Sequence, residues 1–254
     1  GLSSKISHTY VNAVRSFYSV FEIVVKLEGR SALPHPRVYN KRPQLTIMDV
    51  KKLVDHARTP RDRAIILTLF QGGMDASTLC SMKYGDIAEG LKKEEHPLKV
   101  VLFREKTGIE YYTFLGRDSV ESIEAYLNDA SSRGVKFGHN TPLFVKEVGQ
   151  GEPMDTYLVQ KVLREVAMRS GLVDEENNGK DMNPVNPHAL RESFGSIMTN
   201  NGVPDTLVDF WLGHAIGEMA EAYKGVRFEE VKRMYAEREQ FISISVPESE
   251  AIEQ

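Results

Sequence analysis

Only one stretch of this sequence has the pattern of paired β-strands, and that limits the chain to a mainly helical fold. β-branched and aromatic residues fill Lys99–Phe103 and Tyr111–Leu115, and the tripeptide Lys106-Thr107-Gly108 lies between them as a turn. Elsewhere apolar residues recur at the spacing of amphipathic helices. We therefore predict an α+β fold that is mainly α, with one small antiparallel β-sheet.

The helical segments are separated by Gly, Pro and Asn residues, which punctuate the chain. Thr46 and Asp49 form a capping-box-like start for a helix that runs through His56. Residues 89–97 are charged and predicted to form a turn. Further helices are predicted from Pro60 to Gly72-Gly73, from Asp75 or Ser77 onward, and over Ser119–Ser131, Thr156–Ser170, His188–Asn200, Pro204–Leu212 and Phe228–Phe241.

The length favours one large domain, which we expect to span residues 44–241 and to include a C-terminal helix over 228–241. Residues 1–30 are predicted to form an amphipathic helix ending at Gly29. Such a helix cannot bury its apolar stripe alone, so it either docks on the rest of the chain or is the remnant of a further helical domain. Residues 31–43 contain three prolines and basic residues including Lys41 and Arg42. They suit a linker along a polyanion or an ordinary polar connector.

Charge and composition set further limits on the class of protein. The net charge of -4 is unusual for a nucleic-acid binder, but Arg30 to Arg117 holds sixteen basic against ten acidic residues, and residues 242–254 form an acidic tail. No apolar run has the roughly 20 residues of a membrane span, and no signal peptide is recognisable. We expect a soluble, cytoplasmic protein without membrane contact. Cys80 is the single cysteine, expected to be buried, so no internal disulfide can form.

Four residues near the C-terminus could act together on a phosphate. His188 and Arg191 are three residues apart on a predicted helix, Leu212-Gly213-His214 comes later, and Tyr223 stands nine residues after His214. An arginine presents a planar fork to two phosphate oxygens, and histidines donate hydrogen bonds or transfer protons. Taken singly, these residues are more often surface pairs or packing residues, and only their ordered set indicates a site.

This ordered set resembles the tyrosine recombinases and integrases of phages, plasmids and archaeal mobile elements. The resemblance includes His188-x-x-Arg191, Leu-Gly-His ending at His214, Tyr223 at the usual interval, and Lys106 in a Lys-Thr-Gly turn. It spans roughly residues 41–241. It implies a recombinase catalytic domain with the fold of the DNA breaking-rejoining enzymes, and it implies that the first helix is the last helix of a core-binding domain.

The resemblance also implies roles for these residues in DNA integration and recombination. Tyr223 would attack the scissile phosphodiester and form a 3′-phosphotyrosyl bond without a metal or other cofactor. Arg191, His188 and His214 would stabilise charge on the phosphate, and Lys106 would protonate the 5′-oxygen. The partner would be double-stranded DNA near the nucleoid, with dimers to tetramers forming through the C-terminal helix. Candidate DNA-binding residues are Lys41, Arg42, Arg61, Arg63 and Arg104.

One position departs from the family pattern. The family has an arginine two residues after the glycine, where this chain has Gly73-Met74-Asp75. Losing a charge-assisted contact costs roughly 1.5–3 kcal/mol. Three explanations remain open from the sequence: another basic residue such as Arg61, Arg63 or Arg104 substitutes, the chain is a weak or inactive DNA-binding regulator, or the position was engineered.

Other enzyme classes lack their motifs here. There is no His-Glu-x-x-His of a metal hydrolase, no P-loop lysine after Gly72-Gly73, and no Gly-x-Ser-x-Gly of a serine hydrolase. Tyr235 is a second candidate nucleophile, but it belongs to an amphipathic pattern, so we predict that it packs and that Tyr223 reacts.

Overall fold

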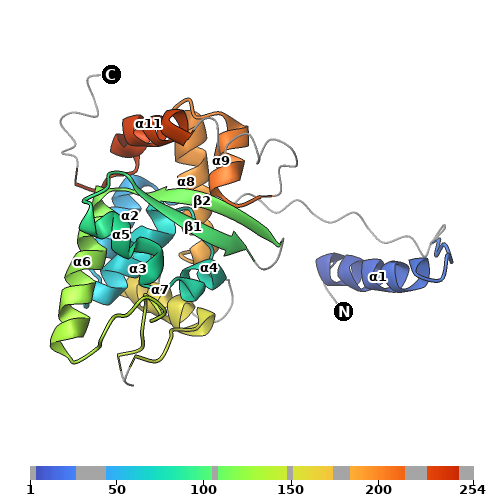
Figure 1. Cartoon of the computed structure of the whole chain (residues 1–254). Coiled ribbons are helices and arrows are strands. Elements are labelled where there is room, and N and C mark those ends of the chain that lie inside the picture. The colour runs from blue at the N-terminus through green and yellow to red at the C-terminus, as the bar shows by residue number, and fades with distance from the viewer. Residues whose placement is uncertain are drawn as a thin grey trace. The chain divides into compact units, whose positions relative to one another are not determined.

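The structure, a computed structural model, describes residues 4–26, 44–104, 108–147, 151–173, 184–214 and 228–245. The chain divides into two compact units, residues 1–42 and 43–254 (Figure 1). Within the described ranges no helix is both long and apolar enough to cross a membrane. The same ranges contain no group of three or more His, Cys, Asp or Glu side chains placed to hold a metal ion.

Unit 1 contains one described helix, α1 (Ser4–Ser19). The prediction that this helix runs to Gly29 was wrong, because residues 20–22 form a turn and residues 23–26 are not helical. The cause is the β-branched run Val20, Ile23, Val24 and Val25, since such side chains lose rotamer freedom in a helix.

Unit 2 consists of helices around one hairpin (Figure 1). Its elements are α2 (Ile47–Asp55), α3 (Pro60–Gln71), α4 (Ala76–Ser81), α5 (Gly85–Lys92), β1 (Leu98–Arg104), β2 (Ile109–Leu115), α6 (Arg117–Ser132), α7 (Thr156–Arg169), α8 (Pro187–Asn200), α9 (Asp205–Trp211), α11 (Phe228–Arg238) and the 3-10 turn η3 (Glu239–Phe241). The mainly α fold with a two-stranded antiparallel sheet is confirmed.

Most helix starts are explained by the local sequence. Thr46 and Asp49 form both hydrogen bonds of the predicted capping box of α2. Thr59 caps α3, which has proline at its first position. The predicted turn over residues 89–97 was partly wrong, because α5 extends to Lys92. α5 is held by tertiary packing of its apolar face, with Ile87 buried, which local propensity alone does not reveal.

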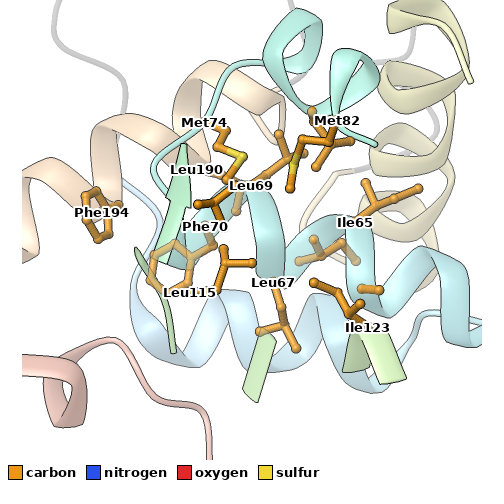
Figure 2. Packing of buried hydrophobic residues seen from close by; sticks show 14 of the residues in the cluster. Ile65, Leu67, Leu69, Phe70, Met74, Met82, Leu115, Ile123, Leu190 and Phe194 are labelled. Atoms are coloured by element: carbon orange, nitrogen blue, oxygen red, sulfur yellow. The ribbon is translucent and has the colours of Figure 1, made fainter. Parts of the chain in front are cut away.

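Helix α3 is the centre of unit 2. It contacts α2, α4, α6, α7, α8 and β2, and almost its whole surface is buried. Figure 2 shows α3 side chains such as Ile65 and Phe70 among Leu115, Ile123 and Leu190, which come from three other elements. A helix that is apolar all round belongs in a core. The C-terminal end of this helix is where the candidate active site is built.

The hairpin pairs β1 and β2 from Leu98 opposite Leu115 to Arg104 opposite Ile109. Tyr112 packs edge-to-face on Phe210 of α9 with ring centroids 4.9 Å apart, and Phe114 lies 5.3 Å from Tyr235 of α11. Edge-to-face and tilted packing of this kind is favourable for aromatic pairs. The hairpin is therefore fixed to both C-terminal helices.

The described C-terminal segment packs on its own domain. Tyr235 is fully buried and its hydroxyl donates a 2.9 Å hydrogen bond to the Gln71 carbonyl, so the prediction that Tyr235 packs is confirmed. The Gln71 amide donates in turn to the Ile242 carbonyl (3.1 Å) and to Asp118 (3.0 Å). Asp118 also accepts from the Ile244 amide, so packing continues beyond residue 241.

Cys80 is only partly buried, which corrects the expectation of a buried thiol. Burial, followed by the negative charges of Asp155 and Asp75, raises the pKa of its thiol to about 11. A thiol with so little thiolate at neutral pH is a poor nucleophile.

Candidate active site

Two glycine turns bring distant parts of the sequence together. Gly73, two residues after the end of α3, has φ of 60°, and Gly213, two residues after the end of α9, has φ of 63°. At each turn the glycine amide and the amide after it bond back to carbonyls of the preceding helix, which is the Schellman arrangement. A Cβ on Gly73 would lie 2.6 Å from the Phe194 ring, and one on Gly213 would lie 2.7 Å from the Tyr111 ring. Both turns therefore require glycine.

The side chain of Arg191 joins these two turns. Arg191 lies on α8, whose N-terminus is capped by the Asn186 side chain. It is 4% exposed, and its guanidinium donates one hydrogen bond of 2.9 Å to the Gly73 carbonyl and another to the Leu212 carbonyl. Carbonyls at helix C-termini lack helical partners and carry partial negative charge, so they stabilise a buried cation.

The position of the missing family arginine is occupied by a helix cap. The Asp75 carboxylate caps α4, accepting from the Thr78 amide at 2.8 Å and from the Ser77 hydroxyl at 2.7 Å. Burial raises the pKa of Asp75, but these hydrogen bonds and the charge of Arg191 outweigh burial, so the net pKa is lowered. Asp75 is thus an anion beside Arg191.

Arg104 lies beside Asp75 at the end of the hairpin. Its Nε is 3.6 Å from an Asp75 carboxylate oxygen, and its Nη1 donates to the Gly213 carbonyl at 3.0 Å. Burial and then the nearby charge of Arg104 lower the pKa of Arg191. Arg191, Arg104 and Asp75 thus form one cluster, called the pocket below, and these three side chains together carry one net positive charge.

Tyr111 forms a wall of this pocket. It is 2% exposed, and burial raises the pKa of its hydroxyl while the Arg191 charge opposes that rise. A buried phenol whose pKa is raised stays protonated at neutral pH and is not a nucleophile there.

The two histidines differ in their placement. His214 comes directly after the Gly213 turn, and its Nδ1 lies 2.8 Å from an Asp209 carboxylate oxygen, which orients the ring. The His188 side chain is 75% exposed and its Nε2 lies 3.1 Å from Glu192. Arg191 reaches the two glycine turns, whereas the described contact of His188 lies on the exposed surface of α8.

The other predicted residues fall into two groups. Arg61 is buried at the start of α3, 2.9 Å from Asp62, and Arg63 is exposed on the same helix. Lys41, Arg42, Lys106 and Tyr223 lie outside the described residues. The structure therefore brings together Arg191, Arg104 and Asp75, with His214 directly after the Gly213 turn, and it leaves Arg61 and Arg63 at the other end of α3.

Sequence reasoning missed two site residues. In the sequence Tyr111 resembles any aromatic residue of a strand, and its sequence neighbours do not distinguish it from a core residue. Asp209 precedes His214 by five residues, one turn and a half, which was a usable signal for a carboxylate that orients the imidazole.

Comparisons with known proteins find relatives over most of the chain. The sequence profile of the phage integrase family matches residues 43–230, most of the chain. Tyrosine recombinase XerC of Pediococcus pentosaceus is 25% identical over 236 residues, which cover 89% of this chain and 72% of that protein. Tyrosine recombinase XerD of Staphylococcus haemolyticus is 22% identical over 245 residues, covering 92% and 76%.

Solved structures share the fold. The XerA recombinase superposes with a TM-score of 0.55 at 21% identity, covering 89% of this chain and 73% of that one. The Tn1549 transposon integrase, solved in complex with circular intermediate DNA, has a TM-score of 0.57 at 17% identity and covers 88% and 75%.

Proposed function

This chain belongs to the phage integrase family and is a tyrosine-recombinase-type DNA strand transferase, and from that premise we propose how its own residues perform the reaction. Tyr223 is the nucleophile, Arg191 and the two histidines bind the scissile phosphate, and Lys106 protonates the leaving oxygen. The observation that carries the proposal is the convergence of the two glycine turns on Arg191.

The pocket suits a phosphodiester in its transition state. Attack on phosphorus spreads negative charge over the non-bridging oxygens, and donors fixed beforehand stabilise that charge best. Arg191 is held by two backbone carbonyls, and His214 is held by Asp209, so neither group needs to reorganise during the reaction. His188, on the exposed side of α8, is available to a phosphate of bound DNA.

Covalent geometry allows Lys106 and Tyr223 to reach this pocket. Lys106 is two residues from Arg104, a span of at most about 7 Å along the chain. Tyr223 is nine residues after His214 and five before Phe228, so its tethers reach roughly 30 Å and 18 Å. That length permits attack within one chain or on the DNA held by a neighbouring copy.

The reaction conserves the energy of the phosphodiester. The phenolic oxygen of Tyr223 bonds to phosphorus and passes its proton to Nε2 of His214, whose Nδ1 faces Asp209, and the resulting imidazolium donates to the phosphate. The bond from phosphorus to the 5′-oxygen breaks, and Lys106 supplies the proton that makes a 5′-hydroxyl. Attack by a 5′-hydroxyl of another strand reverses these steps, so exchange needs no ATP.

We also propose how the remaining parts act on DNA. Arg63 and the basic residues Lys41 and Arg42 contact DNA phosphates, while unit 1 belongs to a core-binding domain. Support comes from α1, whose apolar residues Tyr10 and Phe17 are about 60% exposed. The protein would assemble to dimers or tetramers on DNA at the nucleoid, and its C-terminal helix would form the contact between copies. Docking of α11 on a neighbouring copy requires this helix to leave its packing against β2 and α3.

A nicked suicide substrate tests the nucleophile. The nick lets a short 5′-hydroxyl fragment diffuse away after cleavage, so the covalent protein–DNA adduct accumulates on a denaturing gel. We expect an adduct with the unmodified chain and none with Tyr223→Phe. Tight DNA binding without any adduct would refute the proposal and would indicate a binding protein.

Two matched variants control for the loss of a phenol. Tyr157→Phe removes an exposed hydroxyl on α7 and should leave the adduct yield unchanged. Tyr235→Phe removes the other candidate nucleophile, and the adduct should persist because that hydroxyl is buried against Gln71.

A further inference from the structure

We propose that Arg104 is a phosphate-binding catalytic residue that replaces the arginine missing at position 75. This inference rests on the proposed strand-transfer function. Among the candidate substitutes Arg61, Arg63 and Arg104 we choose Arg104. Its task is to neutralise a non-bridging oxygen of the scissile phosphate.

The first argument is position. Asp75 lies just after the Gly73 turn at the C-terminal end of α3, and Arg104 is the cation that the described ion pairs place against it. Arg61 lies ten residues before Gln71 on the same helix, a rise of about 15 Å, and it is paired with Asp62. Arg61 therefore cannot substitute at the pocket.

The second argument is how Arg104 is held. Its Nη1 donates to the Gly213 carbonyl, on the same turn whose Leu212 carbonyl holds Arg191. The two guanidiniums thus share one anchoring turn although they come from β1 and α8. A guanidinium has five N–H donors, so it can keep such an anchor and also bind a phosphate oxygen.

The third argument is charge. Arg104 and Arg191 repel each other, and the charge of Arg104 adds to burial, the larger cause, in lowering the pKa of Arg191. Asp75 offsets this repulsion in the absence of DNA and is itself fixed by capping α4. Arg104, Arg191 and Asp75 together keep one net positive charge, which attracts an entering phosphate. Asp75 is then a positioning residue for Arg104.

The test compares charge with hydrogen bonding at one position. Arg104→Gln removes the charge and leaves a shorter side chain with an amide donor, whereas Arg104→Lys keeps the charge. Cleavage rates are measured on the suicide substrate and on the same DNA carrying a neutral methylphosphonate at the scissile position. Arg133→Ala, which removes an exposed arginine on the far end of α6, is the control.

We expect Arg104→Gln to slow cleavage of the native phosphate roughly 100-fold, as loss of one transition-state donor does, with Arg104→Lys closer to the unmodified chain. The deficit of Arg104→Gln should shrink to below about tenfold on the methylphosphonate, because one negative oxygen is gone. Asp75→Arg should not increase cleavage, because Arg104 already neutralises the phosphate.

Each other outcome overturns the inference. A rate for Arg104→Gln within about threefold of the unmodified chain, or an equal deficit on both substrates, would mean that Arg104 only supports the turn. If Arg104→Gln fails to fold, the cleavage rates of Arg104→Lys test the inference instead. A purely structural role of Arg104 predicts that Arg104→Lys loses the same fraction of its rate on both substrates. A chain that forms no Tyr223-dependent adduct refutes the proposed function itself, and the inference falls with it.

Discussion

The turn at Gly213 is a place where one added methyl group should damage the site. Alanine at this position must adopt φ near 63°, and its Cβ would lie 2.7 Å from the Tyr111 ring. The left-handed conformation costs a residue other than glycine roughly 1–2 kcal/mol. Overpacking a core contact adds about 1–3 kcal/mol. We therefore expect Gly213→Ala to lower the free energy of unfolding by roughly 2–5 kcal/mol.

Gly171 provides a matched control. It ends α7 in the same Schellman arrangement with φ of 71°, but a Cβ there would meet nothing within 4 Å. Gly171→Ala should cost only the conformational part, roughly 1–2 kcal/mol. The difference between the two variants measures the close approach of Tyr111 alone.

Urea unfolding monitored by fluorescence reports on this turn directly. Trp211 is the single tryptophan, is fully buried, and lies two residues before Gly213. With a urea dependence of about 2 kcal/mol per molar, the unfolding midpoint should fall by roughly 1–2.5 M for Gly213→Ala and by about 0.5–1 M for Gly171→Ala. Equal shifts would show that the Tyr111 ring moves aside freely and that the turn is not fixed by it.

Three further outcomes are expected. Tyr235→Phe leaves the buried Gln71 carbonyl without its donor, so the free energy of unfolding should fall by about 1–3 kcal/mol, and an unchanged urea midpoint would contradict this contact. The pKa of Asp75 is below its ordinary value of 3.8 in the folded chain, so its stabilisation is complete above about pH 4 and is lost as pH falls through the folded pKa. Asp75→Asn, which keeps the cap, should therefore lose less stability between pH 7 and pH 3 than the unmodified chain, as urea midpoints at both pH values would show. With its pKa near 11, Cys80 should react with iodoacetamide at pH 8 roughly 100-fold more slowly than an exposed thiol of pKa 9, and equal rates would show that the thiol is not shielded.

The sequence by itself determined most of the elements of unit 2. Capping residues, proline at helix starts and glycine at helix ends are local signals, so α2, α3 and α8 began close to where they were predicted. The pattern of β-branched and aromatic residues in the two hairpin strands was an equally local signal. The family motif at His188, Arg191 and His214 was also readable, because it consists of residue types at fixed spacing.

Only the tertiary structure decided how these residues meet. The sequence could not show that the turns at Gly73 and Gly213, 140 residues apart, hold one arginine between them, because that contact depends on the packing of α3, α8 and α9. Nor could it choose Arg104 over Arg61 as the cation beside Asp75, since a buried ion pair and a pocket residue look alike in a sequence. The distance between side chains decides both questions, and long-range packing sets that distance.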